Sequence, residues 1–123
     1  MGERLLALRG ATTCDEDSLA EIDTKTQVLV QAMLDRNEVD HEDIVSIIFT
    51  ATDDLTSQFP ATAARALGLG DVPLICAREL GIDGGMPRAI RVRTSRRTGW
   101  PIASHMRRTC RFRPSWITIS IAA

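Results

Sequence analysis

The sequence predicts an α/β or α+β fold, in which a β-sheet packs against helices. Two observations support this prediction. Short β-branched or alternating apolar segments are separated by two segments with helical periodicity, in the order β-α-β-α-β-β. The chain has 123 residues without a linker-like stretch or an internal repeat, so we expect a single domain over residues 1–123.

The composition is that of an ordinary globular chain, with 44% apolar and 25% charged residues. No apolar run approaches the roughly eighteen residues of a membrane span, and the first ten residues do not form a signal peptide. We therefore expect a cytoplasmic protein with no membrane contact. Three distant cysteines and two histidines give no paired metal ligands, so no metal site is expected: Cys14, Cys76, Cys110, His41 and His105.

The first third of the chain predicts a strand and a long helix. Arg4–Arg9 alternates as a strand, and Gly10–Thr13 is then expected to turn the chain. Ser18-x-x-Glu21 is a capping box, so a helix should begin there and run to about Arg36. Its apolar positions form one stripe, which we expect to be buried: Leu19, Ile22, Leu29, Val30, Met33 and Leu34.

The central part predicts the remaining elements. Ile44–Ala51 is nearly continuous in apolar content, which is typical of a central strand buried on both faces. Pro60 suits the first turn of a second helix, which should run to about Leu67 and end at two glycines. Three segments complete the prediction, a strand, a glycine-rich loop and a strand: Val72–Ala77, Gly81–Pro87 and Ala89–Thr94.

The last part of the chain is basic and hard to interpret. All sixteen acidic residues lie at or before Asp83, and only Trp116–Ile121 alternates as a strand would. This asymmetry raises the alternative of an anion-binding or nucleic-acid-binding module, but the aromatic residues are too sparse for stacking on single strands. Nucleic acid is therefore an unlikely partner. Nine arginines follow the last acidic residue: Arg88, Arg91, Arg93, Arg96, Arg97, Arg107, Arg108, Arg111 and Arg113.

Four segments, in this order and spacing, resemble the AroH class of chorismate mutases. They are Leu8–Thr13, Ala51–Leu55 with Phe59–Ala61 and Arg65, Val72–Glu79, and Gly84–Val92. The resemblance covers roughly residues 5–92. It makes 1–92 the family-like part and 93–123 a divergent part. It implies the AroH-type fold, which is an α+β (α/β-like) fold with a mixed sheet and helices packed on one face. It also implies a homotrimer with sites between neighbouring subunits, and the rearrangement of chorismate to prephenate in aromatic amino-acid biosynthesis.

The resemblance also implies roles for individual residues. Arg91 matches the arginine that contacts the ether oxygen of chorismate, and Arg9 matches one that holds the side-chain carboxylate. Glu79, together with Cys76, matches the pair that engages the ring hydroxyl. The catalytic residues are thus expected to be Arg91, Arg9 and Glu79. The substrate-binding residues are expected to be Phe59, Ala61, Thr62, Arg65, Ile75 and Cys76, where Thr62 replaces a lysine of some family members.

The chemistry of a unimolecular pericyclic rearrangement fits these residue types. It needs no nucleophile, metal or cofactor, only restriction of a flexible dianion and stabilisation of separating charges. Arginine suits both tasks because its planar fork binds carboxylates and stays charged. Taken one by one, the same residues also have plainer interpretations. Arg9, Arg78 and Glu79 could be solvated surface residues, and Cys76 and Phe59 could be core residues.

The divergent part departs from the family in ways that affect the site. Family members carry a tyrosine in the late strand that binds a substrate carboxylate, and this chain contains none. Only His105 and Arg113-Pro114 echo that region. A shifted reading frame after about Val92 would explain both the missing acids and the surplus of arginine. Residues 93–123 would then be out of frame or partly disordered, and the protein a weakened or non-catalytic relative that binds a small dianion.

Overall fold

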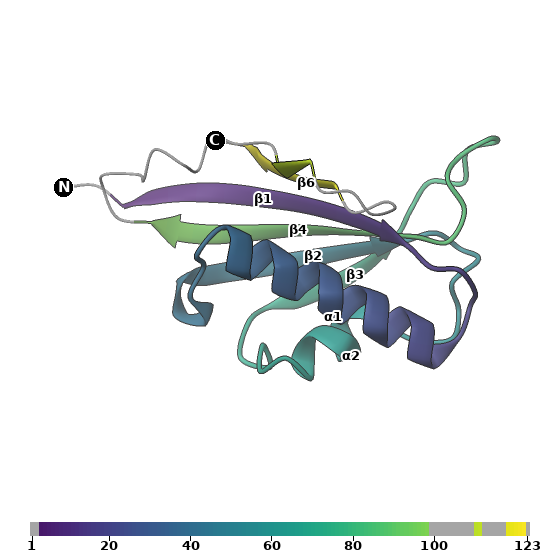
Figure 1. Cartoon of the computed structure of the whole chain (residues 1–123), viewed down its shortest axis with the longest axis horizontal. Helices are drawn as coiled ribbons and strands as arrows, with labels where there is room; N and C mark the ends of the chain where they lie inside the picture. Colours follow the sequence, from purple (N-terminus) through teal and green to yellow (C-terminus); the bar gives the residue numbers. More distant parts are fainter. Residues whose placement is uncertain (1–2, 99–109, 112–117, 123) are drawn as a thin grey trace.

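The computed structural model describes residues 3–98, 110–111 and 118–122. Within them a mixed six-stranded sheet has the strand order β3-β2-β4-β1-β6-β5, and both helices cover the same face (Figure 1). This confirms the predicted α+β class. The elements are β1 (Arg4–Thr13), α1 (Leu19–Arg36), a 3-10 turn (His41–Asp43), β2 (Ile44–Ala51), α2 (Pro60–Arg65), β3 (Leu74–Arg78), β4 (Ala89–Thr98), β5 (Cys110–Arg111) and β6 (Thr118–Ala122).

The turn predicted at Gly10–Thr13 is wrong, because β1 continues through Thr13 and pairs with β4 along its whole length. Gly10 has a different purpose. A Cβ atom at this position would lie 2.6 Å from the Met33 sulfur and 2.9 Å from a Leu29 methyl. The glycine therefore allows α1 to pack closely on the middle of β1.

Helix α1 begins as predicted. The Ser18 hydroxyl accepts a hydrogen bond from the Glu21 amide at 3.2 Å, and the helix ends at Arg36. The predicted stripe is buried with one exception. Leu19 is exposed because it lies before Ile22, which packs in a small buried cluster with Cys14, Leu55 and Ile90. Buried Thr26 extends the stripe instead.

The sequence suggested that strand β2 is buried on both faces, and this prediction is wrong. Ile44, Ile47 and Phe49 are buried, whereas Val45 and Ile48 are about 40% exposed (40% and 38%). The physical reason is that α1 and α2 both pack on one face of the sheet, and no helix of the described residues covers the opposite face (Figure 1). We call this uncovered side the open face.

The later elements differ from the predictions mainly in length. Helix α2 begins at Pro60 but ends at Arg65, before the predicted Leu67, and Gly68 follows with a φ of 85°. Strand β3 begins two residues late, at Leu74, and includes Arg78. Strand β4 passes the predicted end at Thr94 and stays paired with β1 to its own end at Thr98.

The strand predicted at Trp116–Ile121 is present as β6, which pairs antiparallel with β1. Trp116 and Ile117 lie outside the described residues, as do His105 and Arg113-Pro114.

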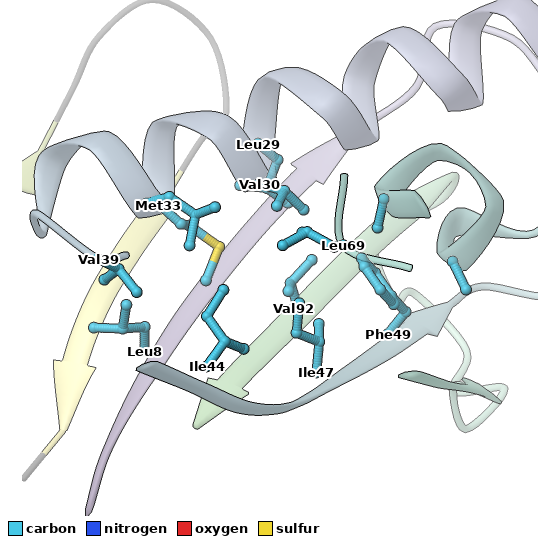
Figure 2. Packing of buried hydrophobic residues seen from close by; sticks show 13 residues of the cluster. Leu8, Leu29, Val30, Met33, Val39, Ile44, Ile47, Phe49, Leu69 and Val92 are labelled. Atoms are coloured by element: carbon cyan, nitrogen blue, oxygen red, sulfur yellow. The ribbon is translucent and has the colours of Figure 1, made fainter. Parts of the chain in front are cut away.

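The core lies between the helices and the covered face of the sheet (Figure 2). It combines side chains of α1 with side chains of the central strands, so that the position of each strand residue is fixed relative to the helix. In the part of the chain that the structure describes, no helix has the length and apolar character to cross a membrane. The main cluster includes Leu8, Leu29, Val30, Met33, Ile44, Ile47, Phe49, Leu69 and Val92.

Candidate active site

Three arginines lie side by side on the open face, at the centre of the sheet. In β1 and β4, Leu8 and Val92 point into the core, so strand alternation turns Arg9 and Arg91 to the other side. Arg91 lies opposite Ala11, and Arg9 lies opposite Arg93, so Arg9 and Arg91 are diagonal neighbours. They line a common pocket of about 430 Å³.

Glu79 is fixed beside Arg91 by hydrogen bonds from two strands. Its amide donates to the Ala51 carbonyl at 3.0 Å, which holds the chain where it leaves β3. The Thr50 hydroxyl donates to one Glu79 carboxylate oxygen at 2.7 Å, and Arg91 forms an ion pair with the other oxygen. The Glu79 side chain is only 14% exposed, against 49% for Arg91. The Glu79 carboxylate is therefore held firmly, while the Arg91 guanidinium stays half exposed to solvent.

Thr50 is a further candidate site residue, and the sequence analysis missed it. We expected both faces of β2 to be buried, so its polar residue was not considered for a site. Alternation along the strand places Thr50 on the same face as Ile48. Register confirms this placement, since Thr50 lies opposite Arg91 in β4. A larger depression of about 650 Å³ borders Thr50, Glu79 and Arg91 on the side of the loop 80–87.

A second group of predicted residues lies around the start of α2. Phe59, the residue just before the helix, is 70% exposed rather than part of the core. It lines a pocket of about 350 Å³ with Cys76, which is also exposed. Thr62 and Arg65 are exposed on α2, whereas the Ala61 side chain is buried in the core.

The two groups do not meet within one chain. Arg9, Arg91 and Glu79 occupy the open face, and Ile75 lies there too, opposite Ile48 in the neighbouring strand. Thr62 and Arg65 belong to a helix on the covered face (Figure 1). Arg91 lines two of the three pockets described above, and Arg65 lines none of them.

Two aspartates that the sequence analysis did not single out anchor the loops of the site. Asp17 accepts hydrogen bonds from the Thr56 and Ser57 amides, both at 3.0 Å, and from the Thr56 hydroxyl. Partial desolvation would raise the pKa of Asp17, but these hydrogen bonds outweigh it and lower the pKa below its usual value. The loop that leads to Phe59 is thereby tied to the beginning of α1.

Asp54 holds the start of β4 in a similar way. Its carboxylate accepts hydrogen bonds from the Thr52 hydroxyl and from the Arg88 amide, and these contacts lower the pKa of Asp54. Arg88 has a φ of 47°, in the left-handed region, and its side chain donates to the Cys14 carbonyl at 3.0 Å. This tightly held residue sets the direction in which the strand enters the sheet, three residues before Arg91.

The two cysteines with described side chains differ in environment. Cys14 is buried, and desolvation raises its pKa to about 11, whereas Cys76 is exposed beside Phe59. Among the described residues, no group of three or more histidine, cysteine or acidic side chains could hold a metal ion.

Comparison with known proteins places this geometry in a family. The family model of chorismate mutase type I matches residues 5–109. The chain is 46% identical over 86 residues to the chorismate mutase AroH of Thermus thermophilus, covering 69% of this chain and 70% of that protein. It is 39% identical over 95 residues to the chorismate mutase AroH of Bacillus subtilis, covering 76% and 75%.

A solved structure gives the same result. A chorismate mutase from Clostridium thermocellum superposes with a TM-score of 0.70 at 42% sequence identity, over 72% of this chain and 79% of that one. The match therefore includes the sheet and helices as well as the sequence segments. The chain belongs to the type I, AroH-class family of chorismate mutases.

Proposed function

We propose that this protein rearranges chorismate to prephenate on the open face of its sheet, with Arg9, Arg91 and Glu79 as the catalytic residues. The activity is that of the family to which the chain belongs, an isomerase of aromatic amino-acid biosynthesis. The observation that carries the assignment of residues is local. A firmly held carboxylate and two arginines lie on one face, within a shared set of strand neighbours.

The reaction asks little of the protein beyond shape and charge. Chorismate is a flexible dianion, and its ether bond breaks while a new carbon–carbon bond forms within the same molecule. Holding the reactive chair-like conformer removes part of the entropic barrier. A guanidinium directed at the ether oxygen stabilises the negative charge that grows there, and such preorganised electrostatics is usually the larger contribution.

Each side chain has a place in this scheme. Arg9 binds the side-chain carboxylate through its two-donor fork. Arg91 is half exposed and turns part of its guanidinium from Glu79 to the ether oxygen. Glu79, held by Thr50 throughout, binds the ring hydroxyl and stabilises positive charge on the ring. The ion pair of the unliganded protein thus orients both partners before the substrate arrives.

The substrate-binding residues near α2 fit the same substrate only if they come from a neighbouring subunit. Cys76, Phe59, Thr62 and Arg65 would then close the pocket from the other side, with Ile75 at its edge. Ala61 is the weakest member of this set, because its side chain is buried in its own core. We therefore propose a homotrimer with sites between subunits.

Exposed apolar side chains support such an assembly. Large ones lie on the open face and in the adjoining loops, where contact with another chain would remove them from water: Ile48, Phe59, Ile75, Leu80 and Ile82. Sedimentation should give three times the 13.5 kDa of one chain. A monomer at micromolar concentration would contradict the shared site.

Three parts of the sequence-based interpretation stay predictions. They are the cytoplasmic location, the shifted reading frame after Val92, and the weakened or binding-only relative. Sequencing the source DNA tests the second, and turnover tests the third. Of the arginines with described side chains, Arg88, Arg91, Arg96 and Arg97 have partners within the protein, which argues against their use in a nucleic-acid module.

The decisive experiment is to incubate pure protein with chorismate and follow the loss of its diene absorbance, with prephenate identified as the product. Catalysis well above the uncatalysed background supports the proposal. Tight binding of prephenate without turnover would instead identify a binding-only relative. No binding and no turnover would reject the assigned site.

A further inference from the structure

Arg93 is an open-face residue to which the family resemblance gives no role. It lies two residues after Arg91 in β4, between buried Val92 and buried Thr94. Its register partners are Arg9 in β1 and Ile48 in β2. Arg93, Arg9 and Ile48 all line the 430 Å³ pocket that also contains Arg91.

Arg9 and Arg93 differ from the other arginines of this region in their lack of partners. Arg91 pairs with Glu79, Arg96 donates to the Asn37 carbonyl at 3.0 Å, and Arg97 donates to the Glu42 carbonyl at 3.3 Å. Across the ranges that the structure describes, neither the Arg9 nor the Arg93 guanidinium has a hydrogen bond or an ion pair.

This arrangement is unfavourable without a ligand. Like charges directly opposite each other on antiparallel strands repel, because their Cβ atoms are only about 4.5–5.5 Å apart. No acidic residue is among the described residues that line this pocket, and the carboxylate of Glu79 is already engaged by two of the lining residues, Thr50 and Arg91. An anion between the two guanidiniums would remove the repulsion.

We propose that Arg93 is a substrate-binding residue that holds one carboxylate of a dicarboxylate ligand jointly with Arg9. The inference rests on the proposed function, in which the ligand is chorismate and the carboxylate is the one assigned to Arg9. A carboxylate has about four lone-pair positions, so it accepts from two guanidiniums at once. Ile48, Gly10 and Ala11 give the pocket an apolar floor, which strengthens such hydrogen bonds. Arg91 is left for the ether oxygen.

The test compares Arg93→Met with Arg97→Met. Both variants remove a guanidinium from the same face of β4, but only the first touches the pocket. We expect the KM for chorismate to rise about tenfold or more in Arg93→Met, the loss of one charge-assisted hydrogen bond, with kcat within about threefold. Arg97→Met should keep both constants. The unfolding midpoint of Arg93→Met should be unchanged or higher, because a repulsion is removed.

Calorimetry with prephenate and with glutarate, a simple dicarboxylate, separates this inference from the proposed function. If the wild type turns over chorismate and Arg93→Met keeps its KM, the role of Arg93 is wrong and the enzyme assignment stands. If the wild type has no turnover, the proposed function fails. Glutarate binding weakened tenfold by Arg93→Met would then still support joint binding of a carboxylate by Arg9 and Arg93. Equal binding by the two proteins, or no binding by the wild type, would reject it. A KM change that accompanies a changed sedimentation coefficient would assign Arg93 to a subunit contact and also reject it.

Discussion

Replacing Thr50 by valine tests whether the carboxylate of Glu79 must be held in place for catalysis. The substitution keeps the branched shape and removes one hydroxyl, which donates to Glu79 at 2.7 Å. Thr50 is half-buried, so the valine methyl group does not disturb the core. Thr50→Ser is the matched control, because it keeps the hydroxyl and loses only a methyl group.

The expected magnitude follows from the burial and charge of the acceptor. A hydrogen bond to a charged group contributes about 1.5–3 kcal/mol, and the Glu79 side chain is mostly shielded from water at 14% exposure. Arg91 still contacts the other carboxylate oxygen, so the lower value applies. About 1.5 kcal/mol corresponds to roughly a tenfold loss in kcat/KM.

The assay is steady-state turnover of chorismate by both variants, together with urea unfolding. The loss in Thr50→Val should appear mainly in kcat, because the proposed role of Glu79 is to stabilise charge that develops in the transition state. Thr50→Ser should stay within about threefold of the wild type. Full activity of Thr50→Val, or an equal loss in Thr50→Ser, would refute the reasoning, because either result would show that catalysis does not depend on the hydroxyl.

Three further predictions concern the scaffold around the site. Gly10→Ala should lower the free energy of unfolding by about 1–3 kcal/mol, because the added methyl meets two buried side chains of α1, whereas Gly70→Ala, in open space, should have little effect in the same urea titration. The pKa of Asp17 is lowered from 3.8 in the folded protein, so its carboxylate stabilises the fold above pH 3.8, and this contribution is lost as the pH falls through the lowered pKa. Asp17→Asn should therefore flatten this part of the acid unfolding curve. An unchanged curve would argue against the role of Asp17 in holding the loop. Cys76 should react with a thiol reagent at pH 8 and be protected by prephenate, while Cys14, with a pKa of about 11, should stay unmodified until the protein unfolds; peptide mapping distinguishes them.

The sequence was sufficient for the elements whose pattern is local. The Ser18 cap and the proline at the start of α2 depend on neighbouring residues, and both were predicted correctly. The reciprocal half of the capping box differs, because the Glu21 carboxylate accepts from the Asp15 amide. Gly10 was misread because its purpose depends on Met33, which is far away in sequence and adjacent only after folding. Likewise, the exposed side of β2 follows from where the helices pack, which no strand pattern contains.

The candidate site shows the same difference between residues in local motifs and residues that act through distant contacts. Arg9, Arg91 and Glu79 were found because short family motifs carry them, and the fold brings these three together on one face. Thr50 and Asp17 have no recognisable motif, since their importance lies in hydrogen bonds to distant segments. Arg65 was predicted from a motif as well, but its place relative to Arg91 depends on a second chain, and that assignment stays a prediction.

The charge on Arg91 tests the central claim most directly. Replacing Arg91 by glutamine keeps a polar side chain and removes the guanidinium that is assigned to the ether oxygen. We expect kcat for chorismate to fall by about 10³ or more, equivalent to about 4 kcal/mol of transition-state stabilisation, with the variant still folded and assembled as the wild type. A loss of less than tenfold would contradict the account, because the open face would then not be where the ether bond breaks.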